Sequence, residues 1–295
     1  MPAITGVTAK SDLGDAVQSE KLDPLAVQAR EGHIYAALCM YRGPEDTQGA
    51  ETYKFPFLDA TADAVVIPDG NDIPATAMTG DAGIATMGEV SQLVETTNPL
   101  VLAQPDTEPA KIINVMGAVH SAVDKLALGL FTSSTFASDF SGTVLTKARL
   151  VEATRAYKVQ VPGSGAHALV LHPDQVANIQ LEIVTPAGTA NADVALGYTA
   201  LFGPETGYKG TWQGYHVFES NNVPEYDATN WMGAVFRIPR GKGDYGALGL
   251  AVWSPLMLLL RQRHNATSHN LIGSANVGLT ITQPNMINGI ISLKT

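Results

Sequence analysis

Hydrophobic side chains recur along the chain with two different periods, which together predict a mixture of helices and strands. The clearest helical period covers residues 109–130, where apolar residues return at spacings of three and four. That stripe consists of Ile112, Val115, Met116, Val119, Val123, Leu126 and Leu130. A helix of about 22 residues would be about 33 Å long, which is a long strut for a chain of 295 residues.

Shorter patterns predict the remaining elements. Further helical stretches are expected over residues 24–40, 146–158 and 173–182. Pro24 and Pro173 suit a first helical turn, and Thr146 is an N-cap residue. The predicted strands cover residues 167–171, 215–218, 234–238, 248–253, 256–263, 277–281 and 287–293. Because helices and strands alternate without a regular βαβ repeat, the predicted fold class is α+β.

Residues 52–90 follow a different pattern. Phe55 and Phe57 occupy alternate positions, which predicts a strand, and a short apolar run follows at 65–67. The rest of the segment is rich in Thr, Ala and Gly, with too few large apolar residues to form a core. A two-stranded excursion of this kind is marginally stable in water, so we expect it to be held by another surface, such as a neighbouring subunit.

The composition excludes several classes of protein. The chain has 18 basic and 28 acidic residues and a formal net charge of −10, which argues against a coat protein that neutralises nucleic-acid phosphates. The N-terminus has neither the basic nor the apolar region of a signal peptide. The longest apolar run, Leu256 to Leu260, is too short to cross a bilayer. We therefore expect a soluble protein made in a cytoplasm, without membrane contact.

Thiol and metal chemistry have little support in the sequence. Cys39 is the single cysteine and lies in an apolar run, which predicts a buried small hydrophobic residue. His167 and His172 flank a predicted strand, and a metal ion between them would need a third ligand from elsewhere. We interpret both as hydrogen-bonded or helix-capping histidines, and we expect no metal site and no catalytic residue.

Residues Gly241 to Gly246 match the G-x-G-x-x-G pattern of dinucleotide-binding proteins. In those proteins a helix begins directly after the glycines and its N-terminus faces the pyrophosphate. Here residues 248–253 predict a strand instead, and a suitable acidic residue about 20 positions on is missing. We interpret the glycines as a turn and expect no cofactor.

Basic residues are concentrated in the last quarter of the chain. They are Arg237, Arg240, Lys242, Arg261 and Arg263. The sequence leaves two interpretations open, namely ion pairs between subunits and contact with nucleic acid.

Three segments resemble the major capsid proteins of tailed double-stranded DNA bacteriophages. Residues 167–175 resemble the strand and following helix of that family, and residues 207–224 resemble its G…G-x-x-V-x-x-S-x-x-V-P pattern. The ending is also similar, from Arg261-Gln262-Arg263 through Ile272-Gly273 to Val277-Gly278-Leu279. The resemblance covers nearly the whole chain in order and implies the Hong Kong 97 phage capsid fold, also called the Johnson fold.

The resemblance also implies how the chain is divided. The expected parts are an N-arm at 1–43, an E-loop and its base at 44–90, a peripheral domain with the spine helix at 91–134, an axial domain at 135–215, and a return to the peripheral domain with the C-terminal strands at 216–295. The E-loop of one subunit would lie over its neighbour. The contact residues expected there are Phe55, Phe57, Val65, Val66 and Ile67.

A structural role follows from the resemblance. Hexamers and pentamers of the chain would form an icosahedral virion capsid, assembled in the host bacterial cytoplasm, that contacts the packaged double-stranded DNA weakly. The short N-arm implies a separate scaffolding protein, and a portal and a decoration protein are further expected partners. Between Phe55 and Pro109 the chain has no lysine, which argues against the Lys–Asn crosslink that some members form.

Two alternatives remain at this point. An encapsulin-type compartment would share the fold and would enclose protein cargo instead of DNA. A nucleotide- or metal-dependent enzyme would require the glycines at 241–246 or the His167/His172 pair to bind a ligand.

Overall fold

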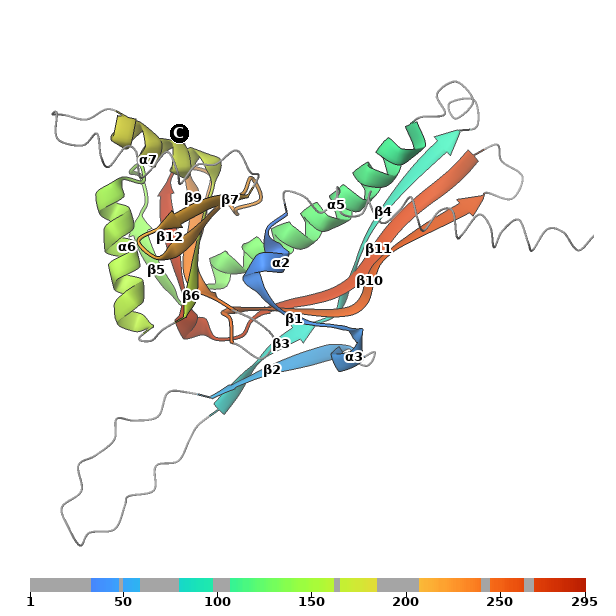
Figure 1. Ribbon diagram of the computed structural model, residues 1–295, viewed down its shortest axis with the longest axis horizontal. Coiled ribbons are helices and arrows are strands. Elements are labelled where there is room, and N and C mark those ends of the chain that lie inside the picture. The colour runs from blue at the N-terminus through green and yellow to red at the C-terminus, as the bar shows by residue number, and fades with distance from the viewer. Residues whose placement is uncertain are drawn as a thin grey trace, which may run out of the picture.

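The computed structural model describes residues 33–47, 50–58, 80–97, 107–161, 165–184, 207–239, 245–262 and 268–295. Within these ranges the strands form a six-stranded, a four-stranded and a two-stranded sheet. Figure 1 shows the six-stranded sheet with its helices on one side of the molecule and a long helix beside long strands on the other. The two-stranded sheet projects away from both.

The six-stranded sheet contains strands from the middle and the end of the chain. In spatial order its strands are β5 (Phe136–Phe140), β12 (Ile287–Leu293), β9 (Asn230–Ile238), β6 (Ala166–Leu171), β8 (Tyr215–Glu219) and β7 (Tyr208–Trp212). Alternate residues of β6 enter different cores: Leu169 packs in the cluster that contains residues of α6 (Lys147–Gln160) and α7 (Pro173–Val184), and Val170 in the cluster that contains residues of the long helix.

Helices α6 and α7 begin at residues whose side chains satisfy free backbone N–H groups. The Thr146 hydroxyl accepts a hydrogen bond from the N–H of Arg149, which confirms the predicted N-cap. At α7 the Nδ1 atom of His172 accepts from the N–H of Asp174, while the N–H of His172 donates to Oε1 of Gln175. This reciprocal arrangement is a capping box in which histidine takes the place of Ser or Thr.

The four-stranded sheet supports the long helix. Its strands are, in spatial order, β1 (Cys39–Arg42), β10 (Leu248–Gln262), β11 (Ser268–Ile281) and β4 (Gly88–Thr97). Helix α5 (Thr107–Gly129) lies along β11 and β4 and confirms the predicted spine helix (Figure 1). A β-carbon at Gly273 would lie 2.7 Å from Cγ1 of Val115, so only glycine permits this close approach. The 3₁₀ helix η1 (Leu130–Ser133) follows α5 directly.

The remaining elements connect these parts. The two-stranded sheet pairs β2 (Thr52–Leu58) with β3 (Gly80–Thr86), which runs into β4. Two short helices, α2 (Tyr35–Leu38) and α3 (Pro44–Thr47), flank β1, and the 3₁₀ helix η2 (Pro284–Met286) precedes β12. No helix in the described ranges is long and apolar enough to cross a membrane.

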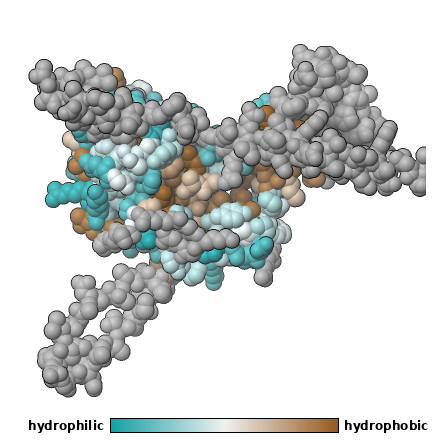
Figure 2. All heavy atoms as spheres, in the orientation of Figure 1, coloured by the Kyte–Doolittle hydropathy of each residue, from teal (hydrophilic) through white to brown (hydrophobic). Residues whose placement is uncertain are grey.

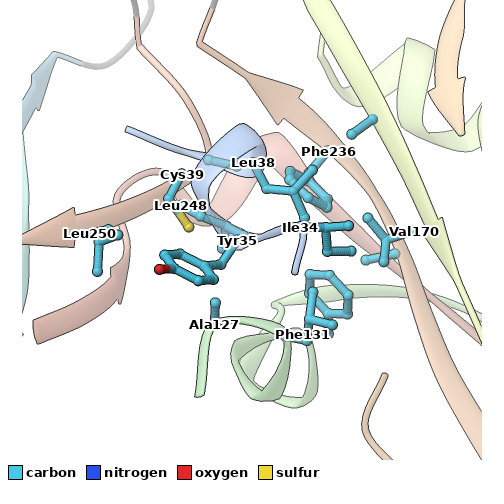
Figure 3. Close-up of a cluster of buried hydrophobic side chains, with 14 of the residues drawn as sticks. Ile34, Tyr35, Leu38, Cys39, Ala127, Phe131, Val170, Phe236, Leu248 and Leu250 are labelled. Carbon is cyan, nitrogen blue, oxygen red and sulfur yellow. The ribbon is translucent and has the colours of Figure 1, made fainter. Parts of the chain in front are cut away.

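A single core connects the two larger sheets. Figure 3 shows Ile34 and Leu38 of α2 among Phe131, Val170 and Phe236, which come from η1, β6 and β9. All of these side chains are buried. The first described helix therefore lies between the spine helix and both sheets.

The structure corrects the prediction for residues 24–40 at its C-terminal end. Only Tyr35–Leu38 are helical, because Cys39 to Arg42 pair in parallel with Leu248 to Ala251 of β10. Residues 24–32 lie outside the described ranges. The expected domain boundary at 215 falls at the first residue of β8, which pairs with β7, and β9 and β12 also join that sheet. Strands β10 and β11, which lie in the part expected at 216–295, belong to the four-stranded sheet.

Candidate functional site

Asp124, near the C-terminal end of α5, joins three distant parts of the chain. Its Oδ1 atom accepts hydrogen bonds from the N–H groups of Ile34 (3.2 Å) and Tyr35 (2.9 Å). Its Oδ2 atom accepts from Oγ of Ser220 (3.3 Å) and Nδ2 of Asn222 (2.9 Å). The residue is fully buried. Since Ile34 has no side-chain cap of its own, Asp124 caps the N-terminus of α2 from 90 residues away.

Two histidine rings stack beside this carboxylate. The Tyr35 hydroxyl is hydrogen-bonded to Nδ1 of His120 at 2.7 Å, and the ring centroids of His33 and His120 are 6.0 Å apart. Burial lowers the pKa of His33, and the negative charge of Asp124 opposes that shift. Cys39 lies nearby with 4% of its surface exposed, and burial raises the pKa of its thiol. The prediction that Cys39 is buried is confirmed.

An apolar groove of about 410 Å³ lies beside this cluster, between α2, β1, α5 and strands β10 and β11. Buried side chains such as Val119, Val123 and Leu250 form part of its lining. Figure 2 shows hydrophobic residues in the middle of this face of the molecule, between the part with the six-stranded sheet and the part with α5. The lining suits a hydrophobic group better than a charged substrate.

The base of the β2–β3 hairpin is attached to its own chain. Phe55 is 1% exposed and packs with Met40, Ala85 and Ala251. A β-carbon at Gly249 would lie 2.9 Å from the Phe55 ring, so the ring rests directly on the backbone of β10. Its own subunit already covers the ring, which argues against the predicted role of Phe55 at the subunit interface.

The other expected contact residues of the hairpin have different positions. Phe57 follows Phe55 by two residues on β2 and is half-buried, and Ile84 on the paired strand is exposed. Val65, Val66 and Ile67 lie outside the described ranges.

An exposed apolar row crosses the outer face of the four-stranded sheet. Leu259 of β10 pairs with Ile272 of β11, which pairs with Leu93 of β4. Directly paired residues share a face of the sheet, and α5 covers the opposite face. Leu93 is 52% and Leu259 43% exposed, and Ile272 is half-buried. We call these three residues the sheet-face row. The sequence analysis missed it, because strand register, which is not visible in the sequence, brings its members together.

The two described basic residues of the last quarter, Arg237 and Arg261, lie in different sheets. Arg237 lies on β9, paired with His167, in the six-stranded sheet. Arg261 lies near the end of β10, paired with Asn270, in the four-stranded sheet. Figure 1 shows the six-stranded sheet and the end of β10 on opposite sides of the molecule. Arg240, Lys242 and Arg263 lie outside the described ranges.

The two histidines of the sequence analysis have structural partners. His172 caps α7, as predicted, and its ring stacks on Trp231 with centroids 3.6 Å apart. Nδ1 of His167 is hydrogen-bonded to the Tyr157 hydroxyl at 2.9 Å. Among the described residues, no group of three or more His, Cys, Asp or Glu side chains could hold a metal ion.

The glycine pattern at 241–246 is followed by a strand. Residues 240–244 lie outside the described ranges, but β10 begins at Leu248. The helix that a pyrophosphate group would require is therefore replaced by a strand, as predicted.

The chain is similar to known proteins in its structure. No protein-family model and no curated protein matches the chain. Among solved structures, one from Mycobacterium phage Che8 matches with a TM-score of 0.63 and 13% identity, over 88% of this chain and 91% of that chain. The capsid of Ralstonia phage GP4 matches with a TM-score of 0.63 and 9% identity, over 90% of this chain and 92% of that chain.

A third match has an archaeal source. The virus-like particle from Pyrococcus furiosus matches with a TM-score of 0.56 and 11% identity, over 92% of this chain and 98% of that chain. The three matches each extend over about nine-tenths of the chain. The chain therefore has the α+β Hong Kong 97 phage capsid fold that its sequence predicted.

Proposed function

We propose that the chain is the major capsid protein of a tailed bacteriophage and assembles into the icosahedral head that encloses double-stranded DNA. The observation that carries the proposal is the fold, shared with phage capsid structures along nearly its whole length. In this function the protein is not an enzyme. Its work is done by surfaces repeated in every subunit, whose individually weak contacts add up in a closed shell.

The β2–β3 hairpin is the E-loop in this proposal. Phe55 fixes its base to β10 of the four-stranded sheet, and Figure 1 shows the two-stranded sheet at the bottom of the view, below the two larger parts of the molecule. Phe57, exposed Ile84 and the segment that contains Val65, Val66 and Ile67 would contact the adjacent subunit. The fixed base would give the contact a defined direction, which lowers the entropy lost when subunits join.

The sheet-face row would provide a second contact surface. Single exposed apolar residues are common on monomers, but a row that crosses three strands is typical of a surface that becomes covered. Leu93 and Leu259 flank Ile272 on a face that no described helix covers. Burial of this row between subunits would contribute at roughly 25 cal/mol per Å² of apolar surface.

The remaining parts of the proposal follow the family. The N-arm would cover residues 1–43, the E-loop and its base 44–90, and the spine helix would lie in a peripheral domain at 91–134. The axial domain, expected at 135–215, would extend to strands β8, β9 and β12, since these pair in the same sheet as β6. Hexamers and pentamers would assemble with a separate scaffolding protein, a portal and a decoration protein, and would contact DNA weakly.

Electron microscopy of the purified full chain, alone and with a co-expressed candidate scaffolding protein, tests the proposal. We expect closed icosahedral particles tens of nanometres across. A variant that lacks residues 60–80 is expected to fold and to fail to form stable particles. A homogeneous monomer or small oligomer under all conditions would contradict the capsid function.

An encapsulin-type compartment is the second candidate. The match to a virus-like particle from an archaeon favours shell formation in general and does not distinguish the contents. Particles isolated from the native source decide between the two: packaged double-stranded DNA supports the capsid, and a protein cargo supports the compartment.

A further inference from the structure

The segment that enters the described fold at His33 is attached to the spine helix by a small buried cluster. Its polar members are Asp124 and His120 on α5, and His33 and Tyr35 next to them. All hydrogen-bond partners of Asp124 in this structure are neutral groups, two backbone N–H groups and the side chains of Ser220 and Asn222. Among the described residues, hydrogen-bond donors and no cationic side chain therefore contact the Asp124 carboxylate.

We propose that His33, His120 and Asp124 form an acid-sensitive latch, which holds residues 33–38 on the spine helix at neutral pH and releases them as the pH falls. The latch is formed within one subunit. A test of the latch is therefore independent of the proposed assembly into a shell.

The geometry favours a neutral His33. Its ring stacks on His120 at an interplanar angle of 28°, and its Nδ1 atom is buried without a hydrogen-bond partner. A protonated ring would place an N–H donor at this unpaired position and would bring a positive charge beside the second imidazole. Both changes cost free energy because the two rings are partly removed from water.

No other described group near the latch is a strong source of charge. On α2 and β1 the titratable or charged side chains are Tyr35, Cys39, Tyr41 and Arg42, of which Tyr35 and Cys39 are buried. On α5 they are His120 and Asp124, and the adjacent Lys125 is exposed. The loop at 220–222 contributes neutral Ser220 and Asn222, and the facing parts of β10 and β11 are mostly apolar.

The sign of the pH effect follows from burial. Burial lowers the pKa of His33 in the closed state, whereas the released segment has an ordinary histidine pKa of about 6.5. The attraction of Asp124 for a protonated ring opposes this shift and is the smaller of the two causes. Attachment is therefore complete above about pH 6.5 and weakens as the pH falls below it.

Hydrogen exchange of the full chain, followed by mass spectrometry, tests the latch. Protection of the peptide that contains Ile34 and Tyr35 is compared at about pH 7.5 and pH 5.5, corrected for intrinsic exchange at each pH. We expect protection to fall by up to about tenfold, the ceiling for one histidine that titrates over this range. Peptides from α6 are expected to change little and serve as the internal reference.

Two variants separate the latch from general acid sensitivity. His33→Phe keeps an aromatic ring for stacking and removes the titratable nitrogen, so protection should become independent of pH. His33→Gln removes the same charge and keeps the test valid if the first variant folds poorly. His216→Phe removes a histidine from the six-stranded sheet and should behave like the parent chain. The proposal would be overturned if protection in the parent chain did not change with pH. It would also be overturned if both His33 variants kept the pH dependence of the parent chain.

Discussion

Gly249 of β10 lies directly under the ring of Phe55, so that a β-carbon at position 249 would come within 2.9 Å of two ring carbons. The same carbon would come within 2.8 Å of the Thr282 methyl group. This contact fixes the base of the β2–β3 hairpin to the four-stranded sheet. The hairpin's direction is therefore set inside the subunit, before any neighbour is present.

Removal of this anchor is expected to loosen the hairpin. Phe55→Ala should lower the free energy of unfolding by about 3–5 kcal/mol if the base of the hairpin unfolds together with the rest of the subunit. Gly249→Ala should cost about 1–3 kcal/mol, because the ring and its neighbours would have to move. Thermal unfolding and limited proteolysis of the hairpin measure both changes.

Phe57→Ala is the matched control for Phe55→Ala. It removes the same type of ring two positions along β2, where the ring is only half-buried. We expect little loss of subunit stability and a clear loss of particle formation, which electron microscopy detects. Equal stability losses for the two variants would contradict the assignment of different roles.

The Asp124 carboxylate should be important for stability because it accepts the backbone N–H groups at the N-terminus of α2. Asp124→Ala leaves the N–H groups of Ile34 and Tyr35 without an acceptor, and each unpaired buried group costs about 1–3 kcal/mol. We expect a marked fall in Tm and early exchange of the α2 amides. Asp124→Asn keeps one acceptor oxygen and should be milder, while Lys125→Ala on the exposed side of α5 should have almost no effect.

The sequence predicted the elements whose signals are local. Helix α5 follows from its apolar stripe, and α6 from Thr146 directly before a helical period. Strand β1 was missed because Cys39 to Arg42 become a strand only through parallel pairing with β10, about 200 residues later. Edge strands β5 and β7 were missed for a similar reason, since their mixed burial patterns give no clear alternation.

The candidate surfaces were harder to predict than the elements. Alternation showed that Phe55 and Phe57 belong to a strand, but it could not show that Phe55 is covered by Gly249 of its own chain. The basic residues were grouped by their nearness in sequence, while the fold puts Arg237 and Arg261 in different sheets. Contacts between distant segments decide both outcomes, and a single sequence does not contain them.

His172 should make the stability of the six-stranded sheet depend on pH. Its ring stacks on Trp231, and its Nδ1 atom accepts the N–H of Asp174, which requires that nitrogen to be unprotonated. Burial is the main cause that lowers its pKa; the Asp174 carboxylate, 3.4 Å away, opposes the shift, and nearby Lys294 adds to it. The stability that a neutral His172 contributes is therefore present above about pH 6.5 and is lost as the pH falls below it.

His172→Asn isolates this contribution, because asparagine is a good N-cap residue that does not titrate. Thermal unfolding between about pH 7.5 and pH 5.5 should show a smaller fall in Tm for the variant than for the parent chain. At pH 7.5 the variant should be somewhat less stable, since it loses the stacking on Trp231. A variant with the same pH dependence as the parent would show that His172 is not responsible.

The sheet-face row offers a direct test of assembly. Leu259→Glu and Leu93→Glu each place a charge on the exposed apolar face and should block particle formation, because an unpaired charge would be buried between subunits. Tm of the subunit should change little, since both side chains are about half exposed. Gln92→Glu is the matched control. It adds the same charge one position before Leu93, but the side chain lies on the other face of the sheet because successive residues of a strand point to opposite faces. Sedimentation and electron microscopy measure particle formation. We expect normal particles from Gln92→Glu and no particles from the two leucine variants. Normal particles from all three variants would show that the sheet-face row stays exposed in the shell.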